Sequence, residues 1–241
     1  MADWVGRAAW YLRPLRDRTL EELRRSQRLF ADETTAPVLE PGRGHTKTGQ
    51  IWAYARDDRP WGGSDPPIYA PDRKAERPDA HLGDFAGILQ VDGYGGYTAL
   101  AKRRQQVSLA FCWSHVRRKF FELADKSPVA TEILRRIAML YAVEDEVRGT
   151  SVEQRRAMRD EHSRVVVDDL KLYLEARLRQ VSAKSKLADA IGYALSRWDG
   201  LSRFLDDGRV DLDTNIVERS IRPLALNRKN ALFAGSDEGG V

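Results

Sequence analysis

The periodicity of apolar residues changes once along this chain, and that change constrains the fold more than any other feature. Before about residue 116, short segments rich in β-branched and aromatic residues alternate with turns that contain glycine and proline. From residue 126 to residue 211, apolar residues recur every three or four positions, which indicates helices only. One more helix is expected after Asp213. The pattern therefore predicts an α/β core that is interrupted by an all-helical insertion.

Five segments of the first half are typical of strands. They are residues 28–39, 50–58, 68–71, 87–94 and 106–113. The first two flank the glycine-rich stretch "PGRGHTKTG" and predict a hairpin. Three of the five strands are expected to run as a meander and the others to join through helical connections, so we expect a mixed five-stranded sheet with helices on both faces.

The same pattern predicts how the chain is divided. Thr19, followed three residues later by Glu22, is expected to begin a helix as a capping box. The expected parts are an N-terminal helical linker segment (1–28), the first part of the core (29–125), the all-helical insertion (126–211) and the last helix with the C-terminal segment (212–241).

Positive charge is concentrated in two segments of the chain. The net charge is +4, but residues 101–120 carry +6 and residues 215–230 carry +3, so the remainder carries −5. The basic residues that we single out are Arg117, Arg118, Lys119, Arg219, Arg222, Arg228 and Lys229. A face that binds a polyanion requires such clustering, although two solvated helix faces would give the same pattern.

Composition also restricts the cellular setting. Cys112 is the only cysteine, so the chain cannot form an internal disulfide, and a reducing compartment fits. No apolar run is long enough to span a membrane, and no signal-peptide pattern is present. These features predict a cytoplasmic protein.

Three acids stand at the ends of predicted core elements. Asp32 lies in the first strand, Asp92 ends the fourth, and Glu218 lies in the last helix. Carboxylates are the ligands that Mg²⁺ prefers, and two ions ~3.5–4 Å apart can act on both oxygens of a phosphoryl transfer. The glycines after Asp92 would let a phosphodiester backbone approach. Each acid also has an ordinary structural explanation, as a turn residue or as a helix cap.

Four stretches together resemble the transposases of the insertion-sequence-66 family. They are "LFADETTAPVLEPGRGHTKTGQIWAYARDDRPWGG", "GILQVDGYGGY", "CWSHVRRKFFELA" and "TNIVERSIRPLALNRKNALFAGSDEGG". The resemblance implies a ribonuclease-H-like sheet flanked by helices, with the helical insertion before the last, catalytic helix. It also implies an Asp-Asp-Glu triad at Asp32, Asp92 and Glu218, which would hold two Mg²⁺ or Mn²⁺ ions. Relative to the family, the chain is expected to be truncated at both ends and to have a shortened third strand.

The first functional hypothesis is therefore a DNA transposase core that nicks transposon ends and transfers the strand into target DNA. Its expected partners are double-stranded DNA, a second copy of the chain on DNA, and accessory proteins of the same element, with no membrane. Two alternatives stay open: a catalytically silent remnant that binds DNA or a full-length transposase, and a nuclease of the ribonuclease-H type. The long helical insertion and the absence of a fourth obvious acid argue against the nuclease.

Overall fold

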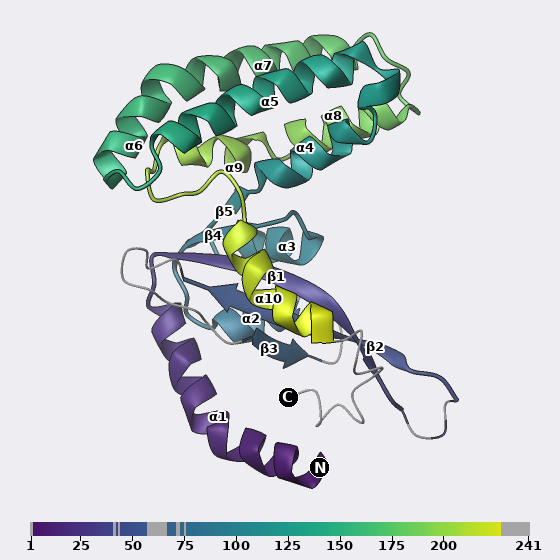
Figure 1. The fold of residues 1–241 in the computed structure, drawn as a ribbon, viewed down its shortest axis with the longest axis vertical. Helices are drawn as coiled ribbons and strands as arrows, with labels where there is room; N and C mark the ends of the chain where they lie inside the picture. The colour runs from purple at the N-terminus through teal and green to yellow at the C-terminus, as the bar shows by residue number, and fades with distance from the viewer. Residues whose placement is uncertain are drawn as a thin grey trace. The chain divides into compact units, whose positions relative to one another are not determined.

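The structure is a computed structural model, and it divides the chain into two compact units (Figure 1). Met1–Leu109 and Thr214–Val241 form the first, which we call the sheet unit, and Ala110–Asp213 form the second, the helical unit. The structure describes residues 2–40, 42, 44–56, 67–70, 73–74 and 76–227.

The sheet unit contains a mixed sheet with the strand order β3-β2-β1-β4-β5. Its elements are α1 (Ala2–Arg24), β1 (Arg28–Val38), β2 (Lys47–Ala55), β3 (Pro67–Ala70), α2 (Glu76–Leu82), β4 (Gly87–Val91), α3 (Gly95–Arg103), β5 (Val107–Phe111), which continues into the next unit, and α10 (Asn215–Asn227). β1 and β2 form the predicted antiparallel hairpin, β3 extends it, and β1 pairs with β4 in parallel. The predicted α/β class is therefore confirmed.

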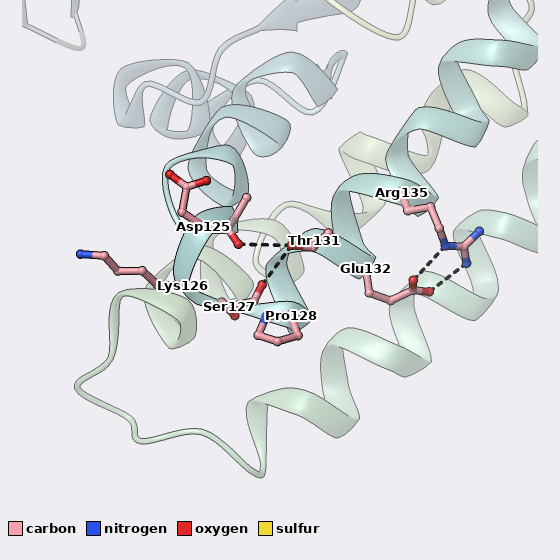
Figure 2. A pocket seen from close by; sticks show the side chains of 8 residues that line it. Asp125, Lys126, Ser127, Pro128, Thr131, Glu132 and Arg135 are labelled. Atoms are coloured by element: carbon pink, nitrogen blue, oxygen red, sulfur yellow. Dashed lines mark hydrogen bonds and ion pairs between the residues drawn. The ribbon is translucent and has the colours of Figure 1, made fainter.

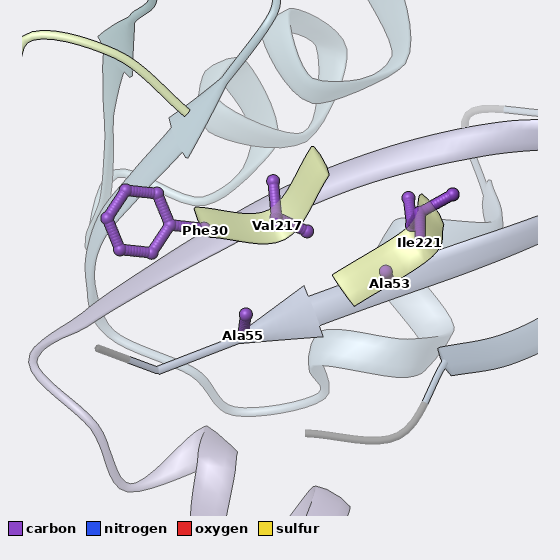
Figure 3. Close-up of a cluster of buried hydrophobic side chains, with 5 residues drawn as sticks. All are labelled: Phe30, Ala53, Ala55, Val217 and Ile221. Carbon is purple, nitrogen blue, oxygen red and sulfur yellow. The ribbon is translucent and has the colours of Figure 1, made fainter. Parts of the chain in front are cut away.

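The helix α10 covers one face of this sheet. Side chains of β1 and β2 alternate between the two faces, so every second one points toward α10. Phe30, Ala53 and Ala55 project toward α10 and form a buried cluster with its residues Val217 and Ile221 (Figure 3). Burial of these apolar side chains stabilises the attachment of α10 to the sheet.

The opposite face of the sheet is lined by aromatic residues. Trp52 and Tyr54 of β2 both contact the ring of His81 in α2, with ring centroids 6.1 and 5.8 Å apart. Trp52 also meets Tyr97 of α3 edge to face at 5.9 Å. Burial lowers the pKa of His81 to about 4, helped by the charges of two nearby arginines, so this histidine is neutral inside the aromatic layer.

All described elements of the helical unit after β5 are helices, as the periodicity predicts. They are α4 (Trp113–Phe121), η1 (Ala124–Lys126), α5 (Pro128–Glu146), α6 (Val152–Met158), the π-helical turn η2 (Arg159–Ser163), α7 (Arg164–Leu178), α8 (Lys186–Leu195), α9 (Trp198–Ser202) and η3 (Arg203–Leu205). The buried indole of Trp113 donates to the carbonyl of Leu201 at 2.9 Å and meets Trp198 edge to face. These contacts attach α4 to the helices of the predicted insertion.

The N-terminal helix α1 is continuous over 23 residues. The predicted helix start at Thr19 is wrong, because Thr19 lies inside α1 and its hydroxyl donates to the carbonyl of Leu15 at 2.9 Å. A threonine whose hydroxyl is satisfied one turn back is compatible with a helix interior. Neither α1 nor any other helix of the described residues has the length and apolar character needed to cross a bilayer.

Candidate metal centre and nucleic-acid interface

Parallel pairing of β1 with β4 brings two of the predicted acids to one place. The register aligns Phe30 of β1 with Gln90 of β4. Two residues further along both segments, the same offset places Asp32 beside Asp92, which directly follows β4. The expected placement on neighbouring strands is therefore confirmed, whereas Asp32 lies inside β1 and not at its end.

The third predicted acid comes from the helix that covers this face. Asp32 pairs in register with Ala53, and Ala53 packs in the cluster with Val217 of α10. Residues paired in register share a face of a sheet, so Asp32 also points toward α10. Glu218 follows Val217 in that helix, and its carboxylate accepts a long hydrogen bond of 3.4 Å from the hydroxyl of Thr214.

The electrostatics of Asp32 show that the acids influence one another. Burial and neighbouring charges raise the pKa of Asp32 to about 7. Desolvation is the largest cause, and the carboxylates of Glu33, Asp92 and Glu218 raise the pKa further. The N–H of Glu33, which donates to Asp32 Oδ1 at 2.8 Å, acts in the opposite direction. Clustered, partly desolvated carboxylates of this kind are typical of sites that take up a cation.

Glu33 is an acid of this cluster that the sequence analysis did not single out as a site residue. It follows Asp32 on β1 and pairs in register with Trp52, so it points to the opposite, aromatic face. Its side chain is only 2% exposed. Burial raises its pKa, and Asp92 raises it further, while hydrogen bonds from Arg73 and Tyr97 lower it. Its position directly after Asp32, within the same predicted strand, was the signal that could have identified it.

The turn after β4 gives Asp92 a structural role as well as a site role. Its Oδ1 accepts the N–H of Tyr94 at 2.9 Å, and Gly93 has a φ of 123°, which favours glycine. A Cβ at Gly96 would lie 2.2 Å from the ring of Tyr94. Asp92 is thus a turn residue, as its ordinary structural explanation predicts. Its carboxylate has further lone pairs, so it can also bind a metal ion. Gly93 and Gly96 are explained by the turn itself and are no separate evidence for DNA approach.

Two of the predicted DNA-binding residues of the sheet unit are accessible. Arg219 and Arg222 are exposed on α10, and a spacing of three places them on one side of the helix. Both follow Glu218, at the next position and one helical turn later, so a phosphate bound by them would lie near the acids. Arg228 and Lys229 lie outside the described residues.

The predicted basic residues of the helical unit do not share one direction. Arg117, Arg118 and Lys119 are consecutive in α4, and consecutive helical residues point about 100° apart. The guanidinium of Arg117 lies 5.8 Å from the ring centroid of Phe121, and Lys119 Nζ lies 4.4 Å from that of Tyr193. Three such side chains cannot all contact one phosphate backbone in the same way.

A pocket in the helical unit is a competing location for a site (Figure 2). It is lined by Ala124, Asp125, Lys126, Ser127, Pro128, Thr131, Glu132 and Arg135. The hydroxyl of Thr131 bonds the carbonyls of Ala124 and Ser127, at 3.2 and 3.3 Å, and Arg135 pairs with Glu132 at 2.8 Å. The hydroxyl of Ser127 caps α5 by accepting the N–H of Ala130 at 3.2 Å, so these side chains have structural roles at the start of that helix.

Comparison with known proteins gives a family match and three curated relatives. The model of the family described as "Transposase IS66 family" matches residues 1–241. The uncharacterized protein y4qI of Sinorhizobium fredii (strain NBRC 101917 / NGR234) is 48% identical over 252 residues, with 100% of this chain and 47% of that protein covered. The uncharacterized protein y4jD of the same strain is 45% identical over 248 residues, covering 98% and 48%. The chain thus spans about half the length of the curated relatives it matches.

Proposed function

Because this chain belongs to the IS66 family of transposases, we propose that it acts as the catalytic core of a DNA transposase of the Asp-Asp-Glu type. Its substrates are double-stranded DNA at transposon ends and at a target. The reaction is hydrolysis of a phosphodiester at the end of the element, followed by attack of the freed 3′-hydroxyl on target DNA. Self-association on DNA and accessory proteins of the same element are part of this proposal.

The observation that carries the proposal is the electrostatic coupling of the three acids. Asp32 comes from β1, the first strand of the hairpin, Asp92 from the end of the parallel neighbour β4, and Glu218 from the covering helix. The charges of Asp92 and Glu218 raise the pKa of Asp32. The strand β1 pairs antiparallel with β2 and parallel with β4. This mixed pairing supports the ribonuclease-H-like fold that the resemblance implies.

The chain's own residues fit a pair of hard divalent cations. Asp32, Asp92 and Glu218 offer carboxylate oxygens, the donor type that Mg²⁺ and Mn²⁺ prefer. Two such ions would supply activation of the attacking oxygen and stabilisation of the leaving oxygen. For its share of the binding, Asp32 must lose the proton that its raised pKa favours. Arg219 and Arg222 would neutralise phosphates next to the acids.

The same arrangement of carboxylates would also serve a nuclease that stops after nicking. A catalytically silent remnant that only binds DNA would not need these carboxylates. A supercoiled plasmid carrying the ends of an element of this family, with Mg²⁺ or Mn²⁺ or with EDTA, separates these functions. We expect metal-dependent nicking by the wild type and by Asp84→Asn, an exposed acid of the sheet unit, but none by Asp92→Asn. Joining of a pre-cut end to target DNA distinguishes a transposase from a nuclease. Nicking at wild-type rate by Asp92→Asn would remove the proposed site.

The salt dependence of DNA binding tests the surface around Glu218. Replacing both Arg219 and Arg222 with alanine is expected to lower the slope of log affinity against log salt, by about 0.9 for each lost phosphate contact. The double variant of Arg117 and Arg118 is expected to lose fewer contacts, since those residues point in different directions. Filter binding across a salt series gives the slopes.

The matched control for this measurement removes two exposed arginines, Arg18 of α1 and Arg25 in the turn directly after α1, which pair with Glu21 and Glu22. Their loss lowers the net charge equally but should leave the slope unchanged. An Arg219, Arg222 double variant with the slope of the wild type would place the DNA elsewhere on the protein.

A further inference from the structure

The carboxylate of Glu33 is held by three donors on the face of the sheet opposite Asp32. Nε of Arg73 donates to Glu33 Oε1 at 2.9 Å, and a terminal nitrogen of the same guanidinium bonds that oxygen as well. The hydroxyl of Tyr97 donates to Oε2 at 3.1 Å. Arg73 is half-exposed at 46%, whereas Glu33 is buried, so the pair joins a surface segment to the interior of β1.

The same arginine also holds the ring of Tyr94. The guanidinium carbon of Arg73 lies 4.1 Å from the centroid of that ring, and the hydroxyl of Tyr94 donates to the carbonyl of Arg73. The ring further contacts Tyr97 and Trp52, with centroids 5.7 and 5.9 Å away. Gly96 makes this position available, because a Cβ there would meet the ring at 2.2 Å.

These contacts connect to two of the candidate metal ligands. The N–H of Tyr94 donates to Asp92 Oδ1, and Glu33 is the residue after Asp32 on β1. We propose that Glu33, Arg73, Tyr94 and Tyr97, together the Arg73 clasp, are positioning residues that hold the Asp92 carboxylate beside Asp32 for metal binding. The metal-binding part of this inference rests on the proposed function, whereas the holding of the turn does not.

The physical reason is that metal sites need ligands held to within about 0.5 Å of their productive position. The Asx-type hydrogen bond joins Asp92 to Tyr94, within the same turn. The clasp connects that segment to a buried residue of β1 by an ion pair and a stacked ring. Residues that orient metal ligands in this way typically change metal affinity by roughly 10- to 100-fold when they are replaced.

The first test uses hydrogen exchange of the full chain without metal, followed by mass spectrometry of peptides that cover residues 92–97. In Arg73→Gln we expect exchange of this segment to be at least about tenfold faster than in the wild type, the effect of losing one charge-assisted hydrogen bond. Tyr97→Phe, which removes one donor to Glu33, should give a smaller increase. The control Arg18→Gln on α1 should match the wild type. Unchanged exchange in Arg73→Gln would overturn the clasp.

The second test measures Mn²⁺ affinity by the electron paramagnetic resonance of free Mn²⁺. Removal of the Arg73 cation near Asp92 should strengthen Mn²⁺ binding if only charge matters. The clasp predicts the opposite sign, a dissociation constant raised roughly 10- to 100-fold in Arg73→Gln, with partial recovery in Arg73→Lys. Equal or tighter binding by Arg73→Gln overturns the positioning role. A wild type that binds no Mn²⁺ overturns the metal centre instead, while the exchange measurement still decides whether the clasp holds the turn.

Discussion

Replacement of Asp32 by asparagine is expected to give a protein that is more stable than the wild type without metal and inactive with it. Burial and the charges of Glu33, Asp92 and Glu218 all penalise an ionised Asp32 in the folded chain. Asparagine has nearly the same shape but no charge, so the penalty disappears. It also removes an anionic oxygen ligand, so stabilisation by Mg²⁺ or Mn²⁺ and metal-dependent nicking should be lost.

The pH dependence of this effect has a defined sign. The folded-state pKa of Asp32 is about 7, above the ordinary value of 3.8 for an aspartate. A raised carboxyl pKa contributes stability that is complete below the unfolded value and is lost as the pH rises toward the folded value. The free energy of unfolding of Asp32→Asn should therefore increasingly exceed that of the wild type between about pH 4 and pH 7. At higher pH the difference should level off, at roughly 4 kcal/mol at most.

Urea unfolding of both proteins at pH 4.5, 6 and 8, with EDTA or with Mn²⁺, measures these differences. Asp84→Asn is the matched control, since it removes an exposed carboxylate from the same unit. Its stability should follow the wild type at each pH and respond equally to Mn²⁺. An Asp32→Asn protein that Mn²⁺ stabilises as much as the wild type would show that Asp32 is not a ligand.

The sequence predicted the positions of Asp32 and Asp92 because both depend on local signals. Each acid closely follows an apolar run with strand character, and chain order restricts which strands can be neighbours. The alternation of side chains along a strand would also have separated Asp32 from Glu33. The contact of Glu33 with Arg73 could not be predicted, since it joins residues 40 positions apart that only the folded sheet brings together.

Local patterns were wrong at Thr19 and incomplete for α4 and for the basic residues. Thr19 has the spacing of a capping box, yet α1 is continuous there, because the hydroxyl is satisfied by Leu15 and nothing ends the preceding helix. Periodicity placed helices after residue 116 but did not reveal that α4 packs on α9 through the bond of Trp113 to Leu201, 88 residues later. Counting cations likewise ignored that neighbours such as Arg117 and Arg118 point in different directions.

The helical unit contains a second buried charge, which serves stability and not the proposed chemistry. The side chain of Arg159, in the π-helical turn, is 0% exposed and bonds both oxygens of Glu144 in α5, at 2.6 and 2.7 Å. It also donates to the carbonyls of Phe204 and Asp207, at 2.9 and 3.3 Å. One guanidinium thus joins α5, η2 and the segment around η3.

Arg159→Leu is therefore expected to destabilise the protein by about 3–5 kcal/mol, because it leaves a buried carboxylate without its main partner. Urea unfolding of the full chain, together with hydrogen exchange in α5 and α7, measures the loss. Arg164→Leu is the matched control: that residue also pairs with two acids, but it is 40% exposed, so its removal should cost no more than about 1 kcal/mol. The double variant Glu144→Leu, Arg159→Met should recover most of the lost stability, since an apolar pair of similar volume avoids the desolvation of both charges. Equal costs for Arg159→Leu and Arg164→Leu would mean that water reaches the guanidinium of Arg159, and that this ion pair contributes no more than a surface pair does.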